Sequence, residues 1–212
     1  MKSKMFDFYW KNIANTIIRK PFIKKIRRNF DYNKSYSLIT SNCIGGEIYN
    51  DLGMKFLSPT INLWFDERDF LKIAIDPEYY LKKEIVFISD DKYNYPVGKI
   101  DDIKIYFSHY KTETEALAKW KERCNRIDYN NLYVIMSDLE LSDDDFLKFQ
   151  KVSKCKKKIL FTTNPERAKF ENVFYIKMYK KNSYVRKYAV NRMNGFRDFE
   201  IFWDFTRWLS DW

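Results

Sequence analysis

The chain is poor in the residues that build metal centres, disulfide frameworks and flexible linkers. Its 212 residues include only 5 Gly, 5 Pro, 3 Cys and 1 His. The three cysteines lie far apart and form no C-x-x-C pair. This spacing argues against a zinc knuckle or a disulfide framework and favours a reducing, cytoplasmic compartment. No apolar run approaches the length of a membrane span, and the N-terminus lacks the apolar segment of a signal peptide.

The chain does contain a heavy load of aromatic side chains and a concentrated positive charge. Hydrophobic residues make up 45% of the sequence and aromatic residues 19%, which is typical of a folded globular protein. The formal net charge is +10. Residues 1–30 hold nine Lys and Arg and one Asp, and residues 177–197 hold seven Lys and Arg and no acid. The positive charge therefore lies in two segments.

The first basic segment is predicted to be an amphipathic helix. Phe6, Trp10, Ile13 and Ile17 recur at helical spacing, and Pro21 is expected to end or kink the helix. Two interpretations stay open. The helix lies on an anionic membrane surface, such as the inner leaflet, or it packs on its own domain with solvated lysines. Nucleic-acid binding is a third reading, and no recognition motif supports it.

Beyond residue 30, short β-prone runs alternate with helical patterns. The runs cover residues 36–40, 61–65, 85–89, 103–108, 132–137, 159–162 and 173–176. The clearest helical patterns cover 112–127 and 142–152, and we expect Thr112 and Ser142 to be their N-caps. This alternation predicts a three-layer α/β fold, with a mostly parallel or mixed sheet and helices on both faces. We expect two parts: a basic N-terminal extension, residues 1–30, and a single α/β domain, residues 31–212, with an aromatic C-terminal helix.

The most informative motif follows the first β-prone run. Ser41 and Asn42 favour the start of a helix, and Cys43-Ile-Gly-Gly46 would form its first turn. A helix N-terminus attracts anions, and glycines let a ligand approach the backbone. Gly45 and Gly46 could therefore seat a phosphate or diphosphate. The alternative is that the glycines only allow the helix to pack tightly on the sheet. The motif matches neither the dinucleotide-binding fingerprint nor the P-loop.

Candidate catalytic residues follow from the rule that ligands bind at the carboxyl ends of parallel strands, near a switch in strand order. His109 is the most economical general base, although a lone histidine more often makes a structural hydrogen bond. Asp138 and Asp90 follow β-prone runs and are candidate carboxylates. Cys43 is either a nucleophile or a buried structural cysteine. No motif requires a cofactor, and a divalent metal stays compatible with the sequence.

Several motifs recur together in one bacterial family. They are Ser41-Asn-Cys-Ile-Gly-Gly46, Asp51-Leu-Gly-Met-Lys-Phe-Leu-Ser-Pro-Thr-Ile-Asn62, Tyr95-Pro-Val-Gly98, His109-Tyr110, Trp120…Arg123…Arg126-Ile127 and Val134-Ile-Met-Ser-Asp138. Through them, residues 35–180 resemble the domain family of unknown function usually labelled "exopolysaccharide biosynthesis protein", found among capsule and surface-polysaccharide genes. The resemblance implies a pathway and an α/β fold, and no defined reaction.

The function expected from these features is that of a glycosyltransferase-like transferase acting on a nucleotide-linked or lipid-linked sugar. In this hypothesis His109 is the base, and Asp138 or Asp90 positions the acceptor. The donor site is formed by Ser41, Asn42, Cys43, Gly45, Gly46, Lys55 and Asn62. The alternative is a non-catalytic scaffold of the same machinery. It docks on membrane or partners through its basic ends and its aromatic tail, residues 196–212.

Overall fold

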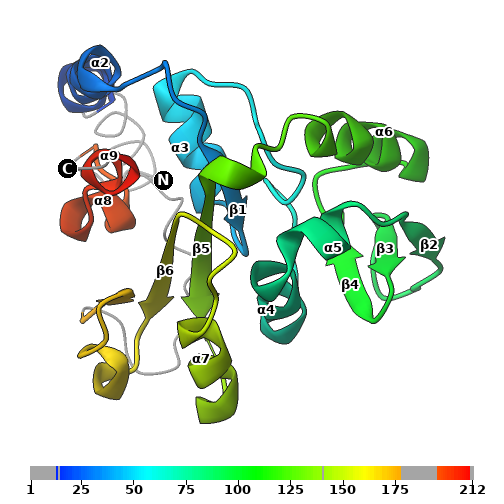
Figure 1. Cartoon of the computed structure of the whole chain (residues 1–212). Coiled ribbons are helices and arrows are strands. Elements are labelled where there is room, and N and C mark those ends of the chain that lie inside the picture. The colour runs from blue at the N-terminus through cyan, green and yellow to red at the C-terminus, as the bar shows by residue number, and fades with distance from the viewer. Residues whose placement is uncertain (1–12, 14, 140, 178–194, 211–212) are drawn as a thin grey trace, which may run out of the picture. The chain divides into compact units, whose positions relative to one another are not determined.

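The computed structural model describes residues 13, 15–139, 141–177 and 195–210, which fall into two compact units (Figure 1). Among these residues, the first unit lies within 13–34, 47–55 and 195–210, and the second within 35–46 and 56–177. Helix α3 (Ile44–Leu52) contributes residues to both units. The second unit contains two β-sheets with helices between their strands, which confirms the predicted α/β class.

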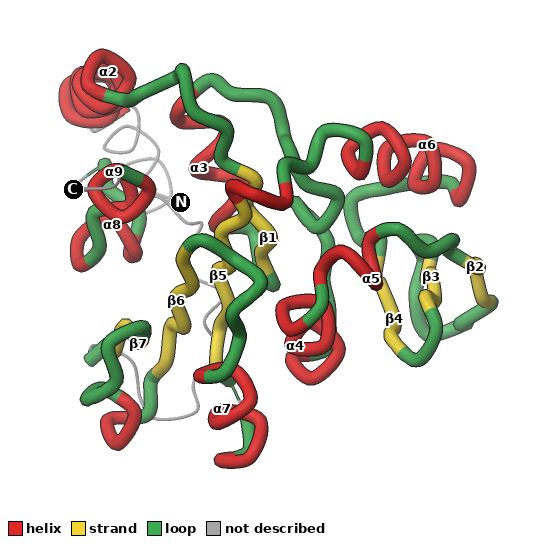
Figure 2. Tube along the Cα trace, viewed as in Figure 1, coloured by secondary structure: helices red, strands yellow, loops and turns green. Residues whose placement is uncertain are grey.

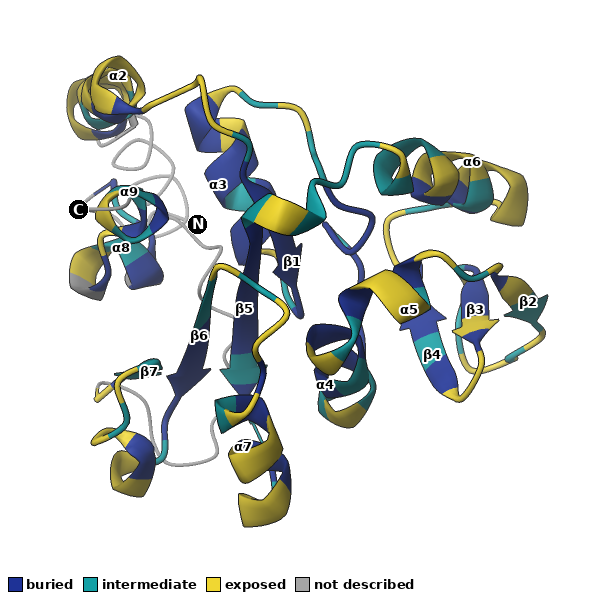
Figure 3. Ribbon diagram, in the orientation of Figure 1, coloured by how far each residue is buried: buried dark blue, intermediate teal, exposed yellow. Residues whose placement is uncertain are grey.

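One sheet of the second unit is parallel and has the strand order β1-β5-β6-β7 (Figure 2). Its strands are β1 (Ser37–Thr40), β5 (Leu132–Asp138), β6 (Lys157–Thr162) and β7 (Val173–Tyr175). The first five residues of β5 are all buried, as expected for a strand with neighbours on both sides (Figure 3). Because all four strands run in the same direction, their carboxyl ends lie along one edge of the sheet.

The strand order of this sheet runs from β1 to β7 without reversing. The switch in strand order that we expected beside a ligand site is therefore absent from the described part of the sheet. The shared edge is present: Asp138 at the end of β5 lies in register with Thr162 at the end of β6. The polar residues that follow the strands are thus neighbours in space.

The second sheet is antiparallel, with the order β2-β3-β4. Its strands are β2 (Val86–Ile88), β3 (Val97–Ile100) and β4 (Ile103–Tyr106). The sequence pattern missed β3, which contains Gly98. A β-carbon on Gly98 would lie 2.7 Å from Ile85 and 3.0 Å from Phe107, so the glycine allows close packing inside this sheet.

The predicted strand at residues 61–65 is wrong. Only Trp64 pairs there, through an isolated bridge to Tyr106 of β4. Asn62 interrupts the extended backbone, because its φ of 61° is left-handed. The segment is instead a loop that leads into helix α4 (Glu67–Ile75).

The remaining helices of the second unit are α5 (Pro77–Leu81), α6 (Glu113–Cys124) and α7 (Asp143–Gln150), with short 3₁₀ turns at Tyr129–Asn131 and Pro165–Arg167. Two predicted N-caps are confirmed. The Thr112 hydroxyl accepts a hydrogen bond from the Glu115 N–H at 3.2 Å, and the Ser142 hydroxyl accepts one from the Asp145 N–H at 3.1 Å.

Helix α4 joins the two sheets into one core. It contacts β5 of the parallel sheet, β4 of the antiparallel sheet and helix α7 (Figure 1). The buried cluster around it includes Val134 and Met136 from β5, Ile103 and Ile105 from β4, and Phe70 from α4 itself. These side chains bury apolar surface continuously from one sheet to the other, which stabilises the second unit as a whole.

The first unit is helical. It contains a π-helical turn (Asn15–Arg19), α2 (Lys20–Asn29), the end of α3, α8 (Asp198–Phe202) and α9 (Phe205–Leu209). The chain stays helical across Pro21, so the expectation that this proline ends the helix is wrong. Pro21 lies in the first turn of α2, directly after the π-helical turn.

The aromatic tail forms much of the core of the first unit. Phe199, Trp203 and Phe205 are buried, and their rings lie 6.1–6.4 Å apart between centroids. Phe196 packs edge-on against Phe22 of α2, with a centroid distance of 5.1 Å. Burial against the chain itself accounts for these residues. The predicted positions Phe6, Trp10 and Trp212 lie outside the described residues.

Candidate functional site

The polar edge of the parallel sheet begins with Asn42, two residues beyond β1. Its Oδ1 accepts a hydrogen bond from the Ile44 N–H at 2.9 Å, which caps α3 as the sequence predicted. Its Nδ2 donates a hydrogen bond to Ser137 Oγ at 2.6 Å. One side chain therefore fixes the start of α3 against the end of β5.

Ser41 extends the pairing of β1 with β5 beyond the strand. Its N–H donates to the Ile135 carbonyl, and its hydroxyl accepts from the Ser137 N–H, both at 3.1 Å. Ser41 is buried, whereas Asn42 and Ser137 are partly exposed. The structure thus brings two predicted ligand residues, Ser41 and Asn42, together with a hydroxyl that sequence reasoning did not select, Ser137.

Gly45 and Gly46 lie tightly against other parts of the second unit. A β-carbon on Gly45 would lie 2.5 Å from Thr40 Cγ2, and one on Gly46 would lie 2.3 Å from Asn62 Oδ1. The packing explanation for the two glycines is therefore realised. It also brings a third predicted ligand residue, Asn62, to the first turn of α3.

The loop before α4 braces the same edge. Thr60 Oγ1 accepts a hydrogen bond from the Thr40 N–H at 3.0 Å, and so occupies the open side of β1.

Two arginines hold this loop in place. Arg123 Nη1 donates to the Ile61 carbonyl at 3.0 Å, and Arg126 Nη1 to the Phe56 carbonyl at 3.2 Å. Arg126 also pairs with Glu122 of α6.

Asp138 is committed to bonds within the protein. One carboxylate oxygen accepts from Thr162 Oγ1 at 2.5 Å and from Arg167 Nη1 at 2.8 Å, and the other accepts from the Leu141 N–H at 3.3 Å. Asp138 is 4% exposed and Arg167 6%. Arg167 also donates to the Leu141 carbonyl and to Asp143. No sequence pattern pointed to Arg167, since its partners lie on other elements.

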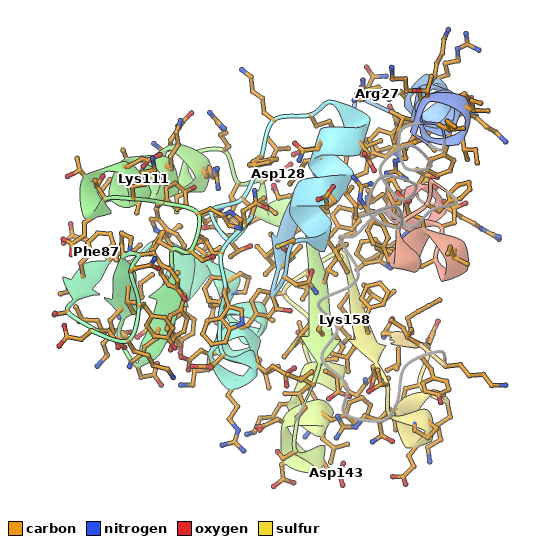
Figure 4. All side chains as sticks on the ribbon, turned by 180° about the vertical axis from the view of Figure 1, so that it is seen from behind. Arg27, Phe87, Lys111, Asp128, Asp143 and Lys158 are labelled. Atoms are coloured by element: carbon orange, nitrogen blue, oxygen red, sulfur yellow. The ribbon has the colours of Figure 1, made fainter. Side chains whose placement is uncertain are left out.

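The other predicted catalytic residues lie away from this edge. His109 is exposed in the turn after β4, two residues before Lys111. Figure 4 shows Lys111 and Asp143, which begins α7, at opposite ends of the second unit. Asp90 organises the turn after β2, where its carboxylate accepts from the Lys92 N–H at 3.3 Å and lies 3.8 Å from Lys104 Nζ. The structure does not bring His109 or Asp90 to Asp138.

Two further predicted ligand residues, Lys55 and Cys43, lie in different places from one another. Lys55 is exposed and belongs to the first unit. Cys43 is exposed at the start of α3, so the expectation of a buried structural cysteine is wrong there. Across the described parts of the chain, no three His, Cys, Asp or Glu side chains are grouped as metal ligands.

The first unit holds a second polar cluster, which is buried and consists of two arginines and three acids. Arg19 and Arg197 both contact Asp51 and Glu200, and Arg197 also pairs with Glu47. Burial raises the pKa of Asp51 to about 7; Arg19 opposes the shift, and the two neighbouring acids add to it. Burial also raises the pKa values of Glu47 and Glu200. The cluster joins α2, α3 and α8 and has one acid in excess.

Sequence comparison places the chain in a family. Residues 13–210 match the model of a domain of unknown function, DUF1919. An uncharacterized protein of Haemophilus influenzae is 32% identical over 191 residues, which cover 89% of this chain and 91% of that protein. The chain belongs to the DUF1919 family. The DUF1919 match includes described residues of both units, so the buried cluster and the polar edge are parts of one family domain.

The resemblance proposed from the sequence is thus confirmed as membership of a domain family of unknown function. In this DUF1919 chain, none of the helices in the described ranges has the length and apolar character needed to cross a bilayer.

Proposed function

We propose that this DUF1919 protein is a glycosyltransferase-like transferase of bacterial exopolysaccharide or capsule biosynthesis. Its donor is a nucleotide-linked or lipid-linked sugar, bound at the polar edge of the parallel sheet. The observation that supports this proposal is the convergence of Ser41, Asn42, Asn62 and Ser137 on the first turn of α3. Amide and hydroxyl groups beside a helix N-terminus suit a diphosphate, which both kinds of donor carry.

Within this proposal, the residues divide into ligand groups and positioning groups. Asn42 and Ser137 are partly exposed and face the ligand, with Ser41 holding β1 to β5 behind them. Asp138 is a positioning residue, because its carboxylate is occupied by Thr162, Arg167 and a backbone N–H. His109 lies in the turn after β4. It can act as the base only when the acceptor itself, or another segment, brings the reacting hydroxyl to that turn.

A thermal-shift screen of the full chain tests the donor site. The probes are nucleoside diphosphates and nucleotide sugars in one arm and a soluble prenyl diphosphate in the other, each with and without Mg²⁺ or Mn²⁺. A probe at a hundredfold excess over its dissociation constant stabilises the native state by about 2.7 kcal/mol. For a domain of this size, that corresponds to an increase in Tm of about 5–10 °C. The arm whose probes raise Tm identifies the donor class.

Asn42→Asp is the decisive variant. Aspartate keeps an oxygen that caps α3, so stability should change by less than about 1 kcal/mol. It replaces the amide NH2 that donates a hydrogen bond to Ser137 with a negatively charged oxygen. This charge should abolish the increase in Tm with any diphosphate. Thr112→Asp is the matched control: it keeps the cap of α6 and adds the same charge beside Lys111, far from the edge. Equal increases in Tm of the two variants with the diphosphate probe would show that the sugar donor does not bind at the polar edge.

A scaffold function is the second candidate, and one observation favours it. The best-placed carboxylate, Asp138, is fully engaged, and the candidate base, His109, lies at a different end of the unit. A non-catalytic protein needs neither group to be free. Absence of a shift across both arms of the screen would favour the scaffold over the transferase.

A further inference from the structure

Helix α2 has an inner side that packs on the first unit and an outer side that does not. Ile26 and Phe30 are buried on the inner side, and Phe22 contacts Phe196 there. Arg27 donates from its Nε to the Asp51 carbonyl at 2.5 Å, at the end of α3. The helix is therefore held in place by its inner side, and its outer side is free to contact something else.

The six basic residues of this region divide in the same way. Arg19 is buried in the acidic cluster, and Arg27 caps the end of α3. The other four, Lys20, Lys24, Lys25 and Arg28, are exposed and have no ion-pair partner in the described parts of the chain. No acid occurs in residues 8–30. The outer side thus presents four positive charges that no acid among the described residues pairs with.

Exposed isoleucines continue the outer side toward the N-terminus. Ile17 is 67% exposed, Ile13 44% and Ile18 38%. Ile17 and Ile18 belong to the π-helical turn that precedes α2. Lys24 and Arg28 are four residues apart, so they follow one side of α2. We call this set the outer face of α2: Ile13, Ile17, Ile18, Lys20, Lys24, Lys25 and Arg28.

The composition of the outer face decides among three kinds of partner. A second copy would bring the same positive charges against it, which is repulsive. Nucleic acid would neutralise the charges but would leave the isoleucines in water. An anionic bilayer satisfies both halves, because lysine and arginine bind its headgroups while isoleucine side chains enter the acyl boundary.

We propose that the outer face of α2 docks the protein on an anionic membrane surface, with the helix axis in the plane of the bilayer. This surface does not depend on the transferase proposal, because it serves an enzyme or a scaffold equally. It would also hold the protein where lipid-linked saccharides are found.

The test is flotation of the full chain with lipid vesicles. One set contains two parts phosphatidylcholine to one part phosphatidylglycerol, and the other only phosphatidylcholine. The chain should float with the anionic set alone, and less so as salt rises. Each basic side chain near such a surface raises partitioning about fivefold, so Lys24→Gln with Arg28→Gln should lower binding about 25-fold. Ile17→Gln should lower it about tenfold.

Lys99→Gln with Lys121→Gln is the matched control, because both lysines are exposed in the second unit and the same charge is removed. It should bind vesicles like the parent chain. Equal binding by the control and by the Lys24 and Arg28 variant would overturn the proposal, as would absence of flotation. Two further outcomes would overturn the proposal. In one, an oligonucleotide displaces the chain from vesicles and binds the Ile17→Gln variant as well as it binds the parent chain. In the other, the only effect of Ile17→Gln is to dissociate a dimer.

Discussion

The two units each bury arginine with carboxylates, and they balance the charges differently. In the second unit, Arg167 faces one buried acid, Asp138, and the exposed Asp143. In the first unit, Arg19 and Arg197 face three acids. The cluster of the second unit is therefore balanced within its buried part, while that of the first unit has one acid too many.

This difference makes the cluster of the first unit titratable. An excess acid takes up a proton more readily, because burial penalises its charge and no further cation compensates. That is why the pKa of Asp51 rises to about 7 although two arginines contact it. We call this cluster of the first unit the junction: Arg19, Arg197, Glu47, Asp51 and Glu200.

The largest effect should come from removing an arginine of the junction. Arg197→Ala leaves the three acids, of which Asp51 is buried, with Arg19 alone, and the free energy of unfolding should fall by about 3–5 kcal/mol. Urea unfolding measures it. Arg207→Ala, which removes an exposed arginine of α9, is the control and should stay within about 0.5 kcal/mol of the parent. A loss as small as that of the control would mean that the cluster is not formed in solution.

A smaller loss should follow when the balanced pair is disturbed. Asp138→Asn keeps one acceptor oxygen, which can serve either the Leu141 N–H or Thr162, and removes the buried charge opposite Arg167. The free energy of unfolding should fall by about 2 kcal/mol, since Asp143 still pairs with Arg167. Diphosphate binding by the folded variant should be unchanged. A stable variant that had lost the ligand would make Asp138 a ligand group and contradict its positioning role.

An effect of similar size is a pH dependence that belongs to the junction. The folded pKa of Asp51 lies above the ordinary value of 3.8, so its contribution to stability is complete below about pH 4 and is lost as pH rises through about 7. Between pH 5 and pH 9 the free energy of unfolding should fall by about 2 kcal/mol from this group. Asp51→Asn should remove that part of the slope and cost little at pH 8. An unchanged slope in the variant would show that Asp51 is not the group that titrates.

Local features of the fold were predictable from the sequence. The caps at Asn42, Thr112 and Ser142 depend on a hydrogen bond to a backbone N–H two or three residues away, and all three formed as predicted. The buried runs of β5 and β6 were equally clear, because their hydrophobic residues are contiguous. The short strand β3 was missed, since Gly98 weakens its pattern and only neighbouring side chains explain it.

Features that depend on distant partners were not predictable. Arg197 is separated from Asp51 by 146 residues, and in the sequence it was only the last residue of a basic segment. Arg167 and Asp138 meet only because β5 and β6 are paired. The candidate site shows both cases. Ser41 and Asn42 were found from local cap chemistry, whereas the role of Ser137 became visible only once β5 lay beside β1.

The most direct test of the central claim, that the polar edge binds the donor, is hydrogen–deuterium exchange of the full chain with and without uridine diphosphate. Binding at the edge predicts slower exchange in residues 37–46, 58–62 and 136–139, with no change in residues 97–111. Protection confined to residues 97–111 would place the ligand beside His109 instead. Either that pattern or unchanged exchange throughout would contradict a donor site at the end of β1 and β5.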